Sequence, residues 1–268
     1  MVQPPASSPA FKATSFLDGL EFPEPLRDAL SRRPMTRGPA IKICGLSSPE
    51  TLGAALDAGA DLVGFVFFEK SPRHLTLAAA QALSVLTSTR AVKVALSVDA
   101  DDNTLDAIVA HAHPDMLQLH GHETPERVSI IRARYGLPVM KAIGVSSAAD
   151  LAAARTYASA ADRLLFDAKP PVDASLPGGN GLPFDWDLLR DVSLAAPYML
   201  SGGLDVANVV EAVTRTGASA VDVSSGVESA PGRKDPARIS ALIRTLRSAA
   251  AGMDASPIET LGSGTRTV

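Results

Sequence analysis

Eight short runs of β-branched and apolar residues alternate with eight segments of helical character between residues 40 and 250. The runs predict strands at 41–44, 62–67, 92–98, 116–119, 139–143, 163–166, 198–200 and 220–223. The segments that follow them predict helices at 49–58, 77–86, 104–112, 125–135, 148–158, 186–194, 206–215 and 236–249. Eight consecutive strand–helix units with short connections predict a single closed (β/α)8 TIM barrel of the α/β class. An open doubly wound sheet is the alternative, which the unbroken alternation disfavours.

The two ends of the chain have a different texture. Residues 1–39 are rich in Pro, Ser and Arg without sustained periodicity, which predicts a disordered or loosely attached N-terminal arm with one short helix near 26–32. Residues 251–268 are polar, and we expect a short loose tail. The barrel is therefore expected to occupy residues 40–250.

Bulk properties exclude several functional classes. A net charge of -4 argues against nucleic acid as the main partner. A single cysteine excludes an internal disulfide and favours a reducing compartment. No apolar run approaches the ~18 residues of a membrane span, and the first ten residues lack the parts of a secretory signal. We expect a cytoplasmic protein without a membrane partner.

The active site of a (β/α)8 barrel lies at the carboxyl ends of its strands, so residues at those positions are the first candidates. Cys44 ends the first predicted strand and shares a strand face with Lys42. Taken alone, Cys44 is more often a small buried hydrophobe. Asp222 lies on the eighth strand, which closes against the first. We predict a Lys42–Asp222 pair, because a lysine inside the barrel needs a compensating charge.

Two glycine- and serine-rich turns follow the last two strands. Gly202 and Gly203 come after strand seven, and Ser224, Ser225 and Gly226 come after strand eight. These are the loops that build a phosphate site in many barrels of this architecture, since glycine lets backbone N–H groups approach an anion. The turns predict a phosphorylated small-molecule partner. The alternative is that they are only tight connections.

Three further candidates occupy strand ends or loops. Asp167 ends strand six before a long Gly/Pro loop, a plausible position for an acid or base. Arg73 lies in a rigid turn and could bind a carboxylate, although a solvated surface turn is an equal alternative. His120 follows strand four and counts among the substrate-binding candidates, although a lone histidine there is more often structural.

Neither a metal nor a cofactor is predicted. The other histidines lack metal-site spacing, and a single cysteine argues against structural zinc. The glycine run at 177–181 does not follow a strand and open a helix, so it is not a dinucleotide fingerprint. It indicates a mobile lid.

In combination, these segments resemble the phosphoribosylanthranilate isomerase family of tryptophan biosynthesis. The resemblance runs from about residue 41 to about residue 246. Its motifs, in order, are Lys42-Ile43-Cys44-Gly45, Gly64-Phe65-Val66-Phe67, Ser71-Pro72-Arg73, Gln118-Leu119-His120-Gly121, Phe166-Asp167, Ser201-Gly202-Gly203-Leu204, Asp222 to Glu228, Pro231-Gly232 and Lys234-Asp235.

The resemblance implies an Amadori rearrangement of N-(5-phosphoribosyl)anthranilate to 1-(2-carboxyphenylamino)-1-deoxyribulose 5-phosphate, without cofactor or metal. It implies that Cys44 is the general base and Asp167 the general acid. Arg73 would hold the anthranilate carboxylate, Asp222 would contact sugar hydroxyls, and the Gly/Ser turns would bind the phosphate. Family members occur as monomers and dimers, so both states stay open for this chain.

Two alternatives and two departures accompany the resemblance. The histidine-pathway aminoaldose isomerase has a similar fold and reaction but uses an aspartate at the end of strand one, where this chain has Cys44. A catalytically silent barrel that binds a phosphorylated ligand is the other alternative. The 39-residue arm is not part of the family pattern, and Asn180 stands where threonine is expected.

Overall fold

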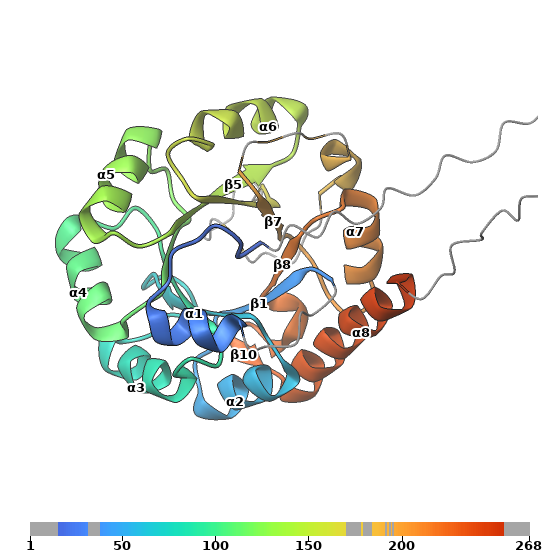
Figure 1. Cartoon of the computed structure of the whole chain (residues 1–268), viewed down its shortest axis with the longest axis horizontal. Helices are drawn as coiled ribbons and strands as arrows, with labels where there is room; N and C mark the ends of the chain where they lie inside the picture. The colour runs from blue at the N-terminus through green and yellow to red at the C-terminus, as the bar shows by residue number, and fades with distance from the viewer. Residues whose placement is uncertain are drawn as a thin grey trace, which may run out of the picture.

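Eight parallel strands close into a barrel in sequence order, β1 to β8, in the computed structural model (Figure 1). The structure describes residues 16–31, 38–169, 178, 184–190, 192, 194 and 196–254. The strands are β1 Ala40–Cys44, β2 Leu62–Phe67, β3 Val92–Ser97, β4 Met116–Leu119, β5 Val139–Val145, β6 Arg163–Ala168, β7 Tyr198–Leu200 and β8 Ala220–Val223. The predicted closed barrel is confirmed.

Helices form a ring around the barrel (Figure 1). They are α2 Pro49–Ala58, α3 Leu77–Thr87, α4 Asp102–Ala112, α5 Pro125–Tyr135, α6 Ala148–Ala154, α7 Val209–Thr216 and α8 Pro236–Asp254. Their starts follow local sequence: Ser48, Thr76, Asp101 and Thr124 each accept a hydrogen bond from the backbone N–H three residues on.

The prediction of a helix over 186–194 is wrong. The described part of this segment contains a single 3₁₀ turn, η2 Trp186–Leu189. The backbone hydrogen bonds among the described residues of this segment join residues three apart, as in the bond from the Val192 N–H to the Leu189 carbonyl, which is the 3₁₀ pattern and not that of an α-helix. Trp186 and Leu189 are nevertheless buried and fill the place of an outer helix.

The alternation of side chains along β1 sets the inner and outer faces of the barrel. Ile41 and Ile43 are fully buried in the cluster between strands and helices. Lys42 and Cys44 point the other way, so the ammonium and the thiol belong to the barrel interior. The β1–β8 register sets Lys42 opposite Asp222 and thereby fixes where the two charges meet.

An N-terminal segment, residues 16–31, covers one end of the barrel. It contains α1 Glu24–Ser31 and crosses the barrel opening in dark blue in Figure 1. Phe16, Phe22 and Leu26 are buried in one cluster with interior side chains such as Met116. This part of the chain is therefore packed rather than loosely attached, because the apolar interior needs a cover.

Arg163, at the start of β6, anchors the N-terminal segment. Its Nε donates to the Phe16 carbonyl at 2.6 Å, and its Nη2 donates to the Asp18 carbonyl. The helix expected near 26–32 is confirmed as α1. Residues 1–15 and 32–37, and the tail beyond 254, lie outside the described residues. Among the described helices, none has the length and apolarity to span a bilayer.

Candidate active site

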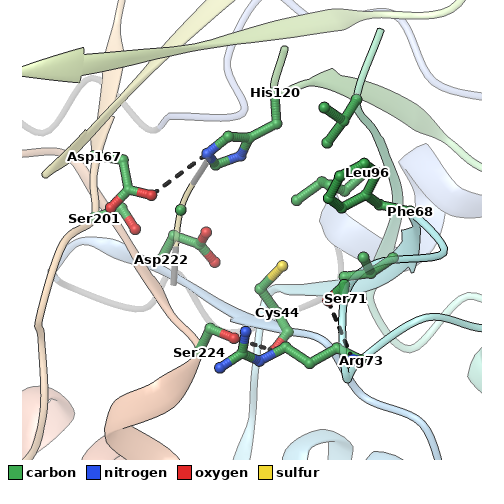
Figure 2. Close-up of a pocket in the computed structure, with 13 residues that line it drawn as sticks. Cys44, Phe68, Ser71, Arg73, Leu96, His120, Asp167, Ser201, Asp222 and Ser224 are labelled. Atoms are coloured by element: carbon green, nitrogen blue, oxygen red, sulfur yellow. Dashed lines mark hydrogen bonds and ion pairs between the residues drawn. The ribbon is translucent and has the colours of Figure 1, made fainter. Parts of the chain in front are cut away.

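An open cavity lies among the carboxyl ends of the strands (Figure 2). The cavity wall includes predicted site residues from six different strands or loops: Cys44, Arg73, His120, Asp167, Asp222 and Ser224. Residues far apart in sequence are thus brought together, as the barrel prediction requires.

Cys44 ends β1, and its sulfur points into the cavity in Figure 2. The residue is 4% exposed and packs with Val66 and Leu96. Gly64, on the neighbouring strand, provides the necessary room: a Cβ there would lie 2.9 Å from Cys44 Sγ and 3.1 Å from Lys42 Nζ. The sequence motif contains Gly64, but its spatial role emerges only from the strand register.

The predicted Lys42–Asp222 pair is confirmed. Lys42 Nζ lies 3.0 Å from Asp222 Oδ1, and both side chains are buried. Burial acts to lower the pKa of Lys42, but Asp222 and Cys44 outweigh it and raise that pKa above its usual value.

The Cys44 thiol is not activated by its surroundings at rest. Burial raises its pKa; Lys42 and Lys234 act in the opposite direction, and Asp222 reinforces the rise. The expected help from Lys42 is therefore present, but burial, reinforced by Asp222, outweighs it, and the thiol is protonated at neutral pH.

Asp167 and His120 form a pair on the far side of the cavity (Figure 2). Asp167 Oδ2 lies 3.4 Å from His120 Nε2, and Asp167 Oδ1 accepts from the Ala168 N–H at 2.9 Å. His120 Nδ1 lies 3.1 Å from the side-chain nitrogen of the fully buried Gln118. Sequence reasoning placed His120 and Asp167 separately and missed the pairing.

Gly178 lies directly against this pair. A Cβ at that position would collide with Asp167 Oδ2 and lie 2.6 Å from His120 Nε2. The rest of the expected lid, including Asn180, lies outside the described residues.

Arg73 lines the cavity, but its guanidinium already holds a protein carboxylate. Its Nε and Nη2 donate to the two oxygens of Glu228 at 2.7 and 2.9 Å. Lys234 Nζ donates to Glu228 Oε1 at 2.6 Å. Glu228 and Lys234 lie on the short hairpin β9 Glu228–Ala230 and β10 Arg233–Lys234.

Sequence reasoning missed this Arg73–Glu228–Lys234 cluster. The available signal was an acid and a base on either side of the Pro231-Gly232 turn. Burial acts to raise the pKa of Glu228, but Arg73 and Lys234 outweigh it and hold that pKa below its usual value. Burial lowers the pKa of Lys234 against the pull of Glu228.

The turns after β7 and β8 stand beside the cavity. Ser224 lines it, donates to the Cys44 carbonyl at 3.2 Å and accepts from Lys234. Gly202, Gly203, Ser225 and Gly226 are outside the lining. At Gly202, φ is +91° and a Cβ would lie 2.7 Å from the Ala168 nitrogen. Close packing of loops thus accounts for this glycine, and a phosphate role for these turns stays a prediction.

Metal ligands are not grouped in the part of the chain that the structure describes. No three His, Cys, Asp or Glu side chains there are arranged to hold a metal ion.

Residues 41–245 match the sequence profile of the N-(5'-phosphoribosyl)anthranilate isomerase family. The isomerase of Rhodopseudomonas palustris strain BisB18 is 60% identical over 207 residues, which span 77% of this chain and 95% of the relative. The crystal structure of the phosphoribosylanthranilate isomerase of Thermotoga maritima matches with a TM-score of 0.70 and 34% identity, covering 78% of this chain and 99% of that one. A phosphoribosylanthranilate isomerase in complex with reduced 1-(o-carboxyphenylamino)-1-deoxyribulose 5-phosphate matches with a TM-score of 0.68 and 32% identity, covering 78% and 99%. The chain belongs to the N-(5'-phosphoribosyl)anthranilate isomerase family.

Proposed function

We propose that this chain converts N-(5'-phosphoribosyl)anthranilate to 1-(2-carboxyphenylamino)-1-deoxyribulose 5-phosphate by an Amadori rearrangement. One observation carries the proposal: a thiol, a carboxyl group and a guanidinium, contributed by distant parts of the chain, line a single cavity. Family membership and the ligand of the related crystal structure support the same substrate.

Asp167 is the proposed general acid. Its carboxyl group donates a proton to the ring oxygen of the ribose, the bond between C1' and that oxygen breaks, and the nitrogen lone pair forms a Schiff base with C1'. The contact with Ala168 N–H holds one oxygen of Asp167, while the other faces His120 and the cavity. Proton transfer of this kind contributes about 10²- to 10⁴-fold in rate.

Cys44 is the proposed general base. Its thiolate removes the proton from C2', the C–H electron pair forms the C1'–C2' double bond as the π pair of the C1'–N bond returns to nitrogen, and the resulting enolamine tautomerises to the ketone. Because the resting thiol is protonated, it first has to release its proton to solvent through the open cavity, and the substrate has to favour this ionisation. The positive Schiff base that forms beside Cys44 supplies that effect.

Substrate anchoring is assigned to the rest of the cavity. Arg73 binds the anthranilate carboxylate. Asp222 binds sugar hydroxyls through Oδ2, since Lys42 takes Oδ1. Ser224, with the neighbouring turns at Gly202, Gly203, Ser225 and Gly226, binds the phosphate.

Steady-state turnover of N-(5'-phosphoribosyl)anthranilate by the purified chain tests the proposal, together with complementation of a strain that lacks this isomerase. Cys44→Ala should lower kcat by about 10³-fold with little change in KM, and it should fail to complement. Near-wild-type turnover by Cys44→Ala would remove the thiol from the mechanism. The histidine-pathway aminoaldose serves as a comparison substrate, and a preference for it would replace the proposed activity.

A further inference from the structure

The Arg73–Glu228–Lys234 cluster carries an unbalanced positive charge against the cavity wall. Two cations share one carboxylate, and the exposed fractions are 7% for Arg73, 4% for Glu228 and 1% for Lys234. Among the described residues, no second carboxylate pairs with Arg73 or Lys234. The cluster therefore keeps one positive charge that no carboxylate of the described residues balances. Burying such a net charge is costly, and a bound anion would reduce that cost.

The neighbouring charges do not supply that anion. The other carboxylates on the cavity wall are engaged elsewhere: Asp222 is paired with Lys42, and Asp167 lies against His120. Lys234 also donates to the carbonyl and hydroxyl of Ser224, at 2.9 and 3.1 Å, which fixes the ammonium beneath the cavity floor rather than inside the cavity. Lys234 itself is not part of the cavity lining.

The guanidinium of Arg73 has a second edge for a ligand. Glu228 uses Nε and one N–H of Nη2, so Nη1 and the other N–H of Nη2 can hold a second carboxylate with two hydrogen bonds. The stem of Arg73 is fixed as well: a Cβ at Gly45 would lie 2.7 Å from Arg73 Cδ. The side chain is thus held both along its stem and at its tip.

A bidentate pair with Glu228 alone would leave Arg73 electrically neutral and a poor receptor for a second carboxylate. From this we infer that Glu228 and Lys234 are positioning residues that select the substrate's aryl carboxylate through Arg73. Glu228 sets the orientation of the guanidinium, and Lys234 offsets the Glu228 charge so that Arg73 remains a net cation. The inference rests on the proposed function, in which Arg73 receives that carboxylate.

Two stable reduced ligands isolate the effect: 1-(2-carboxyphenylamino)-1-deoxyribitol 5-phosphate, and the same compound without the ring carboxylate. Calorimetry gives the affinity ratio of the two for each variant. Wild type should prefer the carboxylate ligand by about tenfold or more. Lys234→Met should lose about tenfold of that ratio, with the affinity for the carboxylate-free ligand unchanged within twofold.

A charge-restoring variant separates electrostatics from structure. Glu228→Gln/Lys234→Met leaves Arg73 as the only charge of the cluster and returns the net charge to that of wild type. Its preference should therefore recover to within about threefold of wild type, which a merely structural role of Lys234 would not produce. Arg233→Met removes an exposed cation from the same hairpin and should leave the ratio unchanged. Lys234→Gln, which keeps a hydrogen-bond donor without charge, should match Lys234→Met and replaces it if that variant fails to fold.

Equal weakening of both ligands by Lys234→Met would overturn the inference and assign Lys234 to the phosphate or to the fold. Failure of the double variant to recover the ratio would overturn it too. Turnover of N-(5'-phosphoribosyl)anthranilate by wild type is measured on the same preparation. Absent turnover with an intact carboxylate preference would count against the proposed function and not against the charge balance.

Discussion

Phe16→Ala tests whether the N-terminal segment is a working part of the barrel. Phe16 is fully buried among interior side chains at the end of the barrel away from the cavity, and the Arg163 guanidinium lies 5.5 Å from its ring centroid. The substitution removes the apolar contact and the cation–π contact together. The backbone bond from Arg163 to the Phe16 carbonyl can remain.

The expected loss follows from the burial. Replacing a fully buried phenylalanine with alanine costs about 3–5 kcal/mol. Residues 16–31 can also detach while the barrel stays folded, so the measured loss cannot exceed the free energy with which this segment docks. We therefore expect Phe16→Ala to weaken the docking free energy of residues 16–31 by about 3 kcal/mol. This corresponds to roughly a 100-fold increase in the detached population.

Limited digestion with trypsin measures the detached population through the rate of cleavage after Arg27, which is exposed on α1. When detachment is fast relative to cleavage, the cleavage rate follows the detached fraction. Phe16→Ala should then be cut at Arg27 about 100 times faster than wild type. Glu21→Ala, an exposed change in the same segment, is the matched control and should be cut at the wild-type rate. Equal rates for Phe16→Ala and wild type would refute apolar docking of the segment.

Three other predictions concern the cavity. The rate of Cys44 alkylation by iodoacetamide should rise with pH, and its midpoint should lie at higher pH than that of free cysteine, because burial raises the thiol pKa. A midpoint at lower pH would show that the nearby cations dominate. Gly178→Ala should lower kcat more than it raises KM, since the added methyl collides with the Asp167 carboxyl; unchanged kinetics would mean that the loop gives way instead. Lys42→Met should lower the free energy of unfolding, measured by urea denaturation, by about 3–5 kcal/mol, because Asp222 loses its buried partner. A loss below about 1 kcal/mol would show that Asp222 binds water or another donor instead.

The barrel itself was predictable from local sequence signals. Strands β2, β4, β7 and β8 have the predicted bounds, because short apolar runs bounded by turn residues specify strand extent with little help from the rest of the fold. The Lys42–Asp222 pair followed too, since barrel closure and strand alternation fix which residues of the first and last strands meet.

The side-chain partners in the loops were less accessible to sequence reasoning. Arg73 meets Glu228 across 155 positions of sequence, and the contact depends on the path of two loops that no periodicity encodes. His120 and Asp167 meet for the same reason. The docking of Phe16 was missed because the apolar residues from Phe16 to Phe22 follow neither a strand nor a helix period.

The Lys42–Asp222 contact also constrains which group can serve as base at position 44. A protonated thiol adds no charge, so it leaves the Lys42–Asp222 ion pair balanced between turnovers. A carboxylate at the same place would put a permanent second anion next to Asp222, and each of the two would raise the pKa of the other. In the proposed mechanism, cysteine carries a negative charge only while the Schiff base of the substrate is positive.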